Sequence, residues 1–263
     1  MSKTPRPTGE PTEEELAMAD AYVRLRLNVE HTWTVGMKRL LDEALRDICR
    51  IVWIYTGGRV NAESFRFKNH PMIELNISSV LDRLRSNLVM LLTMDCETLS
   101  DDTVGELEVA QFDSDIEDIL DGLKEETESR VAAYFYAGYD RAEMEQQMVL
   151  TQSTPWTDKA WLSAVMALQG RAAARILREG GVTSEVGRSK VSANKVRLYG
   201  EGQMNERYKE LMRPRNAGWF LSIVQDGTAC EACKEEADKG WQPIEDYQGL
   251  WHPYCRCRFV FRE

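Results

Sequence analysis

The chain has few histidines and no long apolar run. The first feature leaves little material for acid–base catalysis, and the second argues against a membrane-spanning helix. Three histidines in 263 residues leave few candidates for acid–base catalysis. The longest apolar stretches, Ile51–Tyr55 and Leu88–Leu92, are far shorter than the roughly 20 residues that a membrane-spanning helix needs. The N-terminus has no apolar segment behind its basic residues, so we expect no secretory signal and a reducing compartment. The composition, with 43% hydrophobic and 29% charged residues, is typical of a soluble globular chain.

Charge is distributed unevenly around the overall value of −10. Residues 95–128 contain 14 acidic residues and one basic residue, so this stretch carries −13 and the rest of the chain +3. Residues 188–215 carry +5. The acidic stretch is typical of a solvated helix face, although it is also suited to docking on a basic partner.

Helical periodicity extends over most of the chain, which we expect to be mainly α. Residues 1–11 have almost no apolar side chains, and we interpret them as a flexible arm. The pattern Thr12-x-x-Glu15 predicts a helix start, and Gly57-Gly58 a helix end. A second apolar stripe follows Pro71, and Ser114-x-x-Glu117 predicts a further helix start. Further helices are expected over 155–177 and 189–212, which suggests a helical region at 12–150 and a second domain at 151–263.

Near the C-terminus the pattern changes to short aromatic and β-branched segments. Residues 219–224 and 258–261 are typical of strands. We expect them to pair as a two-stranded antiparallel hairpin, with a loop between them that is closed by cysteines. The predicted fold class is therefore mainly α with a small C-terminal α+β region.

Four of the six cysteines lie in the last 34 residues, and their spacing suggests a metal site. Cys230-x2-Cys233 can present two thiolates to one ion, and a second cluster follows after 21 residues. Cys255 supplies a third ligand. The fourth ligand is either His252 or Cys257. The spacing of His252 to Cys255 mirrors the first pair and slightly favours His252, whereas alternation along a strand would place Cys257 on the same side as Cys255. We expect structural zinc, with disulfides or unliganded thiols as the alternatives. Cys49, beside an apolar stripe, is expected to be a buried, inert thiol, and Cys96 has no motif around it.

The same segment resembles a known family. The residues that carry the resemblance are Trp219, Asp226-Gly227-Thr228-Ala229-Cys230-Glu231-Ala232-Cys233 and Trp251-His252-Pro253-Tyr254-Cys255-Arg256-Cys257. They are similar to the terminal signature of the phage Mu F-like head morphogenesis family, over about residues 165–261. The resemblance implies a minor head (minor capsid) protein of a tailed bacteriophage, found in the virion head or at the portal vertex and in the host cytoplasm during assembly. The implied partners are the portal protein and the major capsid or scaffold protein, and the implied role is head assembly, DNA packaging or DNA delivery.

The residues also bear on two other functions. For an enzyme, His31 and His70 belong to no catalytic motif and no phosphate-binding loop follows a strand, so we expect none. The alternative is a nucleic-acid-binding zinc-knot module that contacts packaged DNA, because the basic 188–215 stretch precedes the cysteines. Further basic and aromatic residues near the C-terminus add to it: Arg256, Arg258, Arg262, Trp241, Trp251 and Tyr254.

Overall fold

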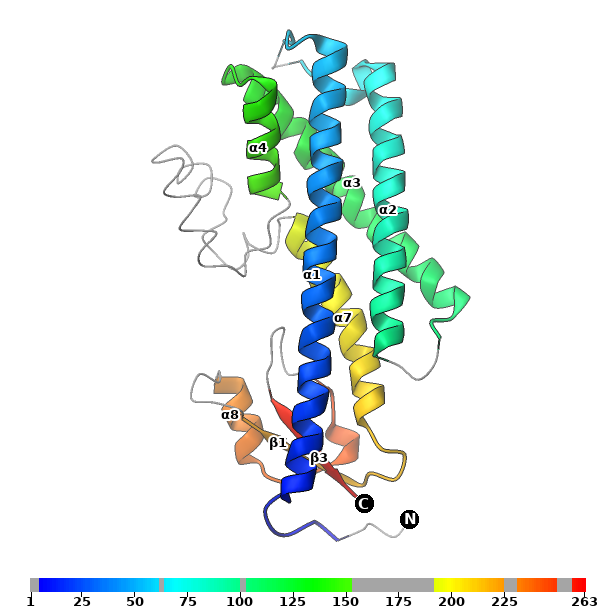
Figure 1. The fold of residues 1–263 in the computed structure, drawn as a ribbon, viewed down its shortest axis with the longest axis vertical. Helices are drawn as coiled ribbons and strands as arrows, with labels where there is room; N and C mark the ends of the chain where they lie inside the picture. Colours follow the sequence, from blue (N-terminus) through cyan, green and yellow to red (C-terminus); the bar gives the residue numbers. More distant parts are fainter. Residues whose placement is uncertain (1–4, 62–63, 100–102, 153–191, 225–230, 250–256) are drawn as a thin grey trace. The chain divides into compact units, whose positions relative to one another are not determined.

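The computed structural model describes residues 5–61, 64–99, 103–152, 192–224, 231–249 and 257–263. Its helices are α1 (Glu13–Thr56), α2 (Pro71–Thr98), α3 (Glu106–Tyr136), α4 (Arg141–Gln152), α7 (Ser192–Met212) and α8 (Glu231–Asp238). Its strands are β1 (Trp219–Ile223), β2 (Gln242–Pro243) and β3 (Arg258–Arg262), and the 3-10 turns are η1 (Phe67–Asn69) and η2 (Ile244–Asp246). The mainly helical class is confirmed (Figure 1). The expected helix over 155–177 lies outside the described residues.

The predicted start and end of the first helix are confirmed. The Thr12 hydroxyl accepts a hydrogen bond from the Glu15 amide (3.2 Å), and the Glu15 carboxylate accepts one from the Thr12 amide (2.7 Å). At the other end Gly57 and Gly58 have φ of 59° and 72°, a conformation that glycine adopts without a steric penalty. The helix start predicted at Ser114 is wrong, because α3 already begins at Glu106 and Ser114 lies in its interior.

The chain divides into two compact units, each described here by itself. One contains Met1–Thr32, Met94–Val104 and Gly200–Glu263, and the other Trp33–Thr93 and Gly105–Tyr199. The predicted boundary near residue 150 adjoins a segment outside the described residues and stays a prediction.

The core of the second unit is built by the apolar stripes of α1, α2 and α3. Trp33 is fully buried and donates its indole N–H to the Arg197 carbonyl at 3.2 Å. Where α1 ends, Phe65 packs edge-on against Phe135 with ring centroids 5.9 Å apart. The buried side chains of the three stripes include Met37, Leu41, Leu45, Ile48, Ile73, Ile77, Leu84, Leu88, Phe112, Ile116 and Leu123. Their spacing at three and four residues explains why the helical pattern could be recognised from the sequence.

The acidic stretch lies mainly on α3, and part of its charge is paired within the same unit. Arg85 forms ion pairs with Asp113 (3.3 Å) and Glu117 (2.9 Å), and the Tyr199 hydroxyl donates to Asp115 at 2.9 Å. Asp118 is among the carboxylates that stay exposed. These contacts agree with a helix face that is partly solvated and partly used for packing.

Asp95, in the last turns of α2, is 6% exposed, and its Oδ2 accepts no hydrogen bond among the described residues. Burial raises the pKa of this carboxyl to about 6. Because the folded state holds the proton more tightly than the unfolded state, the stability contributed by Asp95 is lost as pH rises from about 4 through 6. We therefore expect Asp95→Asn to raise the free energy of unfolding at pH 7.5 by about 1 to 3 kcal/mol, and to change it little at pH 4.

Urea denaturation of both proteins at the two pH values measures this difference. Asp118→Asn, at an exposed position on α3, is the matched control and should change stability by less than about 0.5 kcal/mol. An equal effect of Asp95→Asn at both pH values would contradict the prediction.

The three strands form one antiparallel sheet in the order β2-β1-β3. The predicted pairing of the first and last strands is confirmed, with Trp219 opposite Arg262 and Ile223 opposite Arg258. The expectation of only two strands is wrong, because β2 pairs with the other edge of β1 and places Pro243 opposite Trp219. Proline is tolerated there because β2 is an edge strand. The segment between β1 and β3 is also not all loop, since it contains α8 and η2.

Candidate metal centre

The register of the sheet brings the end of β1 and the start of β3 together at one end of the sheet. β1 ends at Ile223 and leads toward Cys230, and its partner Arg258 directly follows Cys257. The segment that continues from β1 toward the first cysteine pair therefore starts next to the point where the chain enters β3 from the second cysteine pair. This proximity follows directly from the antiparallel pairing of β1 with β3, which the sequence predicted.

The two faces of the sheet carry different side chains. Val260 packs with Ala19 of α1 in one apolar cluster, and Arg258 and Arg262 form ion pairs with Asp20 and Glu15 of the same helix. Alternation then turns Phe259 to the opposite face, where its ring lies 5.2 Å from that of Tyr247. Continued by one residue pair, the same alternation puts Cys257 on the face of Phe259.

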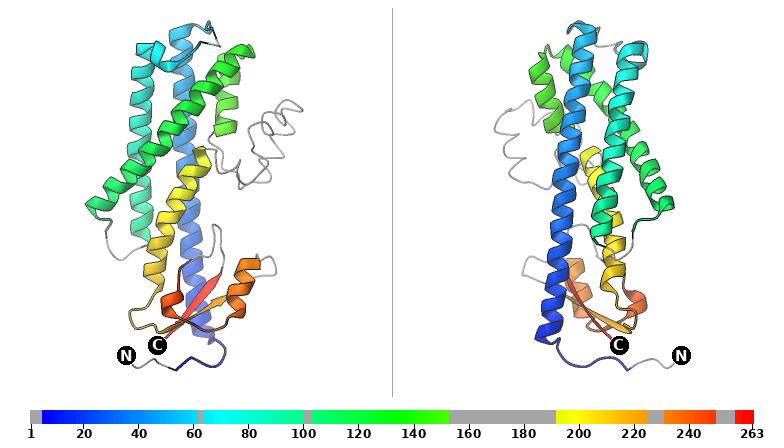
Figure 2. Two further views of the ribbon diagram at one scale, coloured as in Figure 1. Left: turned by 180° about the vertical axis from the view of Figure 1, so that it is seen from behind. Right: turned by 45° about the vertical axis from the view of Figure 1, so that its right-hand side comes forward.

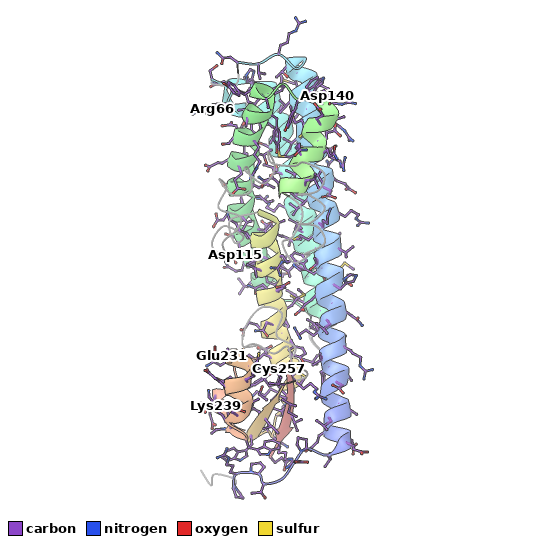
Figure 3. All side chains as sticks on the ribbon, turned by 90° about the vertical axis from the view of Figure 1, so that its left-hand side faces the viewer. Arg66, Asp115, Asp140, Glu231, Lys239 and Cys257 are labelled. Atoms are coloured by element: carbon purple, nitrogen blue, oxygen red, sulfur yellow. The ribbon has the colours of Figure 1, made fainter. Side chains whose placement is uncertain are left out.

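Cys233 reaches that face from α8. It is the buried residue of this helix at 3% exposure, and α8 packs against β1. Figure 3 shows the strands lying between α1 and α8, with Cys257 at the end of the sheet where α8 begins at Glu231. Cys257 is also 3% exposed. The structure thus places two of the predicted ligands, both buried, on the same side and at the same end of the sheet.

The other three predicted ligands, Cys230, His252 and Cys255, lie outside the described residues. Within the described ranges, no cluster of three or more His, Cys, Asp or Glu side chains is close enough to hold a metal. Two buried thiols at one end of a small sheet fit the donor set of structural zinc, which binds cysteine as thiolate. The full ligand set, and the choice between His252 and Cys257, stay predictions.

The remaining cysteines belong to the helical core. Cys49 is fully buried, and burial raises the pKa of its thiol to about 12, with nearby Glu145 adding to the shift. Cys96 is fully buried too. Neither thiol has the exposure that reactive cysteines show, and the pKa of Cys49 is shifted away from the lowered values that they have. The prediction of a buried Cys49 agrees with this position.

Ion pairs connect one face of the sheet to α1. Arg262 donates to both Glu15 oxygens, at 2.8 and 2.9 Å, and its guanidinium lies 4.6 Å from the ring centroid of Trp241. The hydrogen bond from Arg262 lowers the pKa of the Glu15 carboxyl to about 2. The chain before α1 joins the same region, because the Gly9 carbonyl accepts the Trp241 indole N–H at 3.3 Å. These contacts join residues more than 200 positions apart that no sequence motif links, so they could not be predicted from the sequence.

The residues that suggested nucleic-acid binding are largely used in internal contacts. Arg197 is 5% exposed, Lys195 lies 3.8 Å from Glu126, and Lys209 lies 3.6 Å from Glu206. Trp241 is buried beneath Arg262. Arg213 and Arg215 are exposed. Trp251, Tyr254, Arg256, Arg188 and Lys190 lie outside the described residues.

The two histidines outside the cysteine segment are exposed and lie far apart in the sequence, His31 within α1 and His70 just before α2. The helices that the structure describes include none that is both long enough and apolar enough to cross a membrane. Comparison of the chain with protein-family models, curated proteins and solved structures finds no match.

Proposed function

We propose that this chain is a non-enzymatic minor head protein of a tailed bacteriophage, which associates with the portal and acts in head assembly and in packaging or delivery of DNA. The observation that carries the proposal is the pairing of Cys230-x2-Cys233 with His252-Pro253-x-Cys255-Arg256-Cys257 behind a tryptophan-bearing strand. The antiparallel pairing of β1 with β3 supports it, because it gives the two cysteine clusters a common frame.

A zinc ion is part of the proposal. Cys230, Cys233 and Cys255 would hold it together with His252 or Cys257, and the ion would stabilise a segment with little apolar material of its own. Because all ligands come from the protein, no coordination position is left for a substrate, and the role is structural.

The helical region supplies surface for the portal or for a capsid or scaffold protein. Several large apolar side chains remain exposed on its helices, among them Met72 (53%), Leu75 (65%) and Met90 (59%) on α2. Met72 and Leu75 lie one turn apart and form a small exposed apolar patch, and such patches mark protein interaction sites. We assign the portal contact to this face of α2.

Co-purification of the full chain with the portal protein of the same phage tests this proposal. The wild-type chain should be retained on tagged portal, and Met72→Glu/Leu75→Glu should reduce retention at least tenfold, because charge is costly in an apolar contact. Ser114→Glu, at an exposed polar position on α3, is the matched control away from this face and should bind like wild type. Failure of the wild-type chain to bind the portal would contradict the portal association.

The alternative of a DNA-contacting zinc knot has less support. It predicts an accessible cationic surface, whereas Arg197 is buried and Arg258 and Arg262 are paired with α1. Its measurable consequence is DNA binding that weakens steeply with salt and with removal of the exposed Arg213 and Arg215.

A further inference from the structure

A groove of about 520 Å³ lies between α1 and α2 in the second unit, and three arginine side chains line it. The two helices run antiparallel and side by side, as Figures 1 and 2 both show. The lining residues are Leu40, Glu43, Ala44, Arg46, Asp47, Arg50, Val80, Arg83, Leu84 and Asn87. Charged side chains and four apolar ones, Leu40, Ala44, Val80 and Leu84, thus share the lining.

Asp47 holds two of the arginines in a fixed arrangement. Its Oδ2 lies 2.8 Å from Arg83 Nη2, and its Oδ1 lies 3.3 Å from Arg50 Nη1. Arg50 also approaches Glu145 at 3.5 Å through Nε. The side chains of Arg50 and Arg83 are 50% and 63% exposed, so N–H donors of both groups stay available to a ligand.

Arg46 is the arginine of the lining that is not held in an ion pair within the described residues. It lies one turn before Arg50 on α1 and forms no ion pair or hydrogen bond with any residue that the structure describes. Glu43, the second carboxylate of the lining, is exposed and likewise takes part in no ion pair within the described chain. The lining thus has three cations and two carboxylates, of which Asp47 bridges two of the cations, and Glu145 outside the lining also pairs with Arg50.

We propose that this groove binds a phosphate-bearing anion. Guanidinium groups present paired N–H donors that match phosphate oxygens, and the Asn87 amide adds a neutral donor. The lining contains no aromatic side chain on which a base could stack, so the recognised group is the phosphate itself. A free oligophosphate and the backbone of a nucleic acid offer the same oxygens. This site is independent of the proposed function, which rests on the C-terminal cysteines.

Calorimetric titration of the full chain with inorganic triphosphate in 50 mM salt tests the site. We expect binding that Arg46→Gln weakens at least tenfold and that Glu43→Gln tightens severalfold, because the second change removes a repelling charge. The opposite signs separate a binding role from a structural one. Arg24→Gln is the matched control, since Arg24 is an exposed arginine of α1 outside the groove, and it should bind like wild type.

A second titration uses a duplex DNA of about 20 base pairs. Tighter binding of the duplex than of triphosphate, with the same order of variants, supports the site and identifies nucleic acid as the source of the phosphate. Binding of triphosphate alone supports the site and identifies a small anion. Absence of binding for both probes, or equal affinity of wild type, Arg46→Gln and Glu43→Gln, would overturn the proposal.

Discussion

Protein with Cys233→Ala, produced in zinc-containing medium, is expected to purify without the zinc that we expect in the wild-type chain. Cys233 is buried on the side of the sheet where Cys257 lies, so in the proposed site its thiolate would be a fixed ligand that alanine would not replace. Because the unfolded chain has no preformed site, metal binding contributes directly to the stability of the folded segment. Elemental analysis gives the zinc content per chain, and chelation of the wild-type protein should lower the midpoint of its thermal unfolding.

The matched control for this substitution is Cys49→Ala. Cys49 is as deeply buried but lies in the helical core of the other unit, so this variant should keep its zinc while losing about 1 kcal/mol of stability through the small cavity. Zinc retained at full occupancy by Cys233→Ala, or a wild-type chain without zinc, would contradict the metal site.

The same assay decides which residue is the fourth ligand. If His252 binds the ion, His252→Ala should lose zinc and Cys257→Ala should keep it. The reverse pattern assigns Cys257, whose exposure of only 3% is compatible with either role. Both variants are needed because a buried thiol beside a metal site can pack without binding.

The parts of the fold that the sequence predicted are those specified by local contacts. Thr12 and Glu15 satisfy each other's amides whatever lies around them, and Gly57-Gly58 can turn the chain where other residues are strained. The helix start predicted at Ser114 was wrong because serine and glutamate at this spacing also occur inside helices, where the backbone amides are already hydrogen-bonded to the preceding turn. The true counterpart, Asp140 with Glu143 before α4, was missed, although both of its hydrogen bonds form at 2.9 Å.

The parts that could not be predicted depend on contacts between distant residues. β2 is two residues long and exists because β1 offers it an edge, and α8 is eight residues long, too short to be stable without packing against the sheet. The cysteine spacing predicted candidate ligands but not their sides. Only the register of β1 with β3 places Cys257 on the face opposite Val260 and α1.

The second large effect is expected at Arg26, a buried charge within α1. Its side chain is 1% exposed, its Nη1 lies 2.6 Å from Glu30 Oε1, and its guanidinium lies 5.6 Å from the ring centroid of Tyr208. Glu30→Gln removes the charge of a carboxylate that lies 2.6 Å from this buried guanidinium, so we expect a loss of about 2 to 3 kcal/mol in the free energy of unfolding. Arg26→Met keeps most of the volume and removes the buried charge, and it should cost less, since Glu30 at 13% exposure can reach water.

A double-mutant cycle by urea denaturation at pH 7 separates these contributions. Because Arg26 and Glu30 interact directly, the loss caused by Glu30→Gln should be smaller when Arg26→Met is already present, and the two losses should not add. The matched control is Lys38 with Asp42, a pair of the same spacing and the same 2.6 Å distance on the same helix, but with side chains 36% and 24% exposed. Asp42→Asn should cost under about 0.5 kcal/mol, because solvent already screens that pair. Equal losses of unfolding free energy for Glu30→Gln and Asp42→Asn would contradict the prediction, because they would mean that burial of Arg26 does not strengthen its interaction with Glu30.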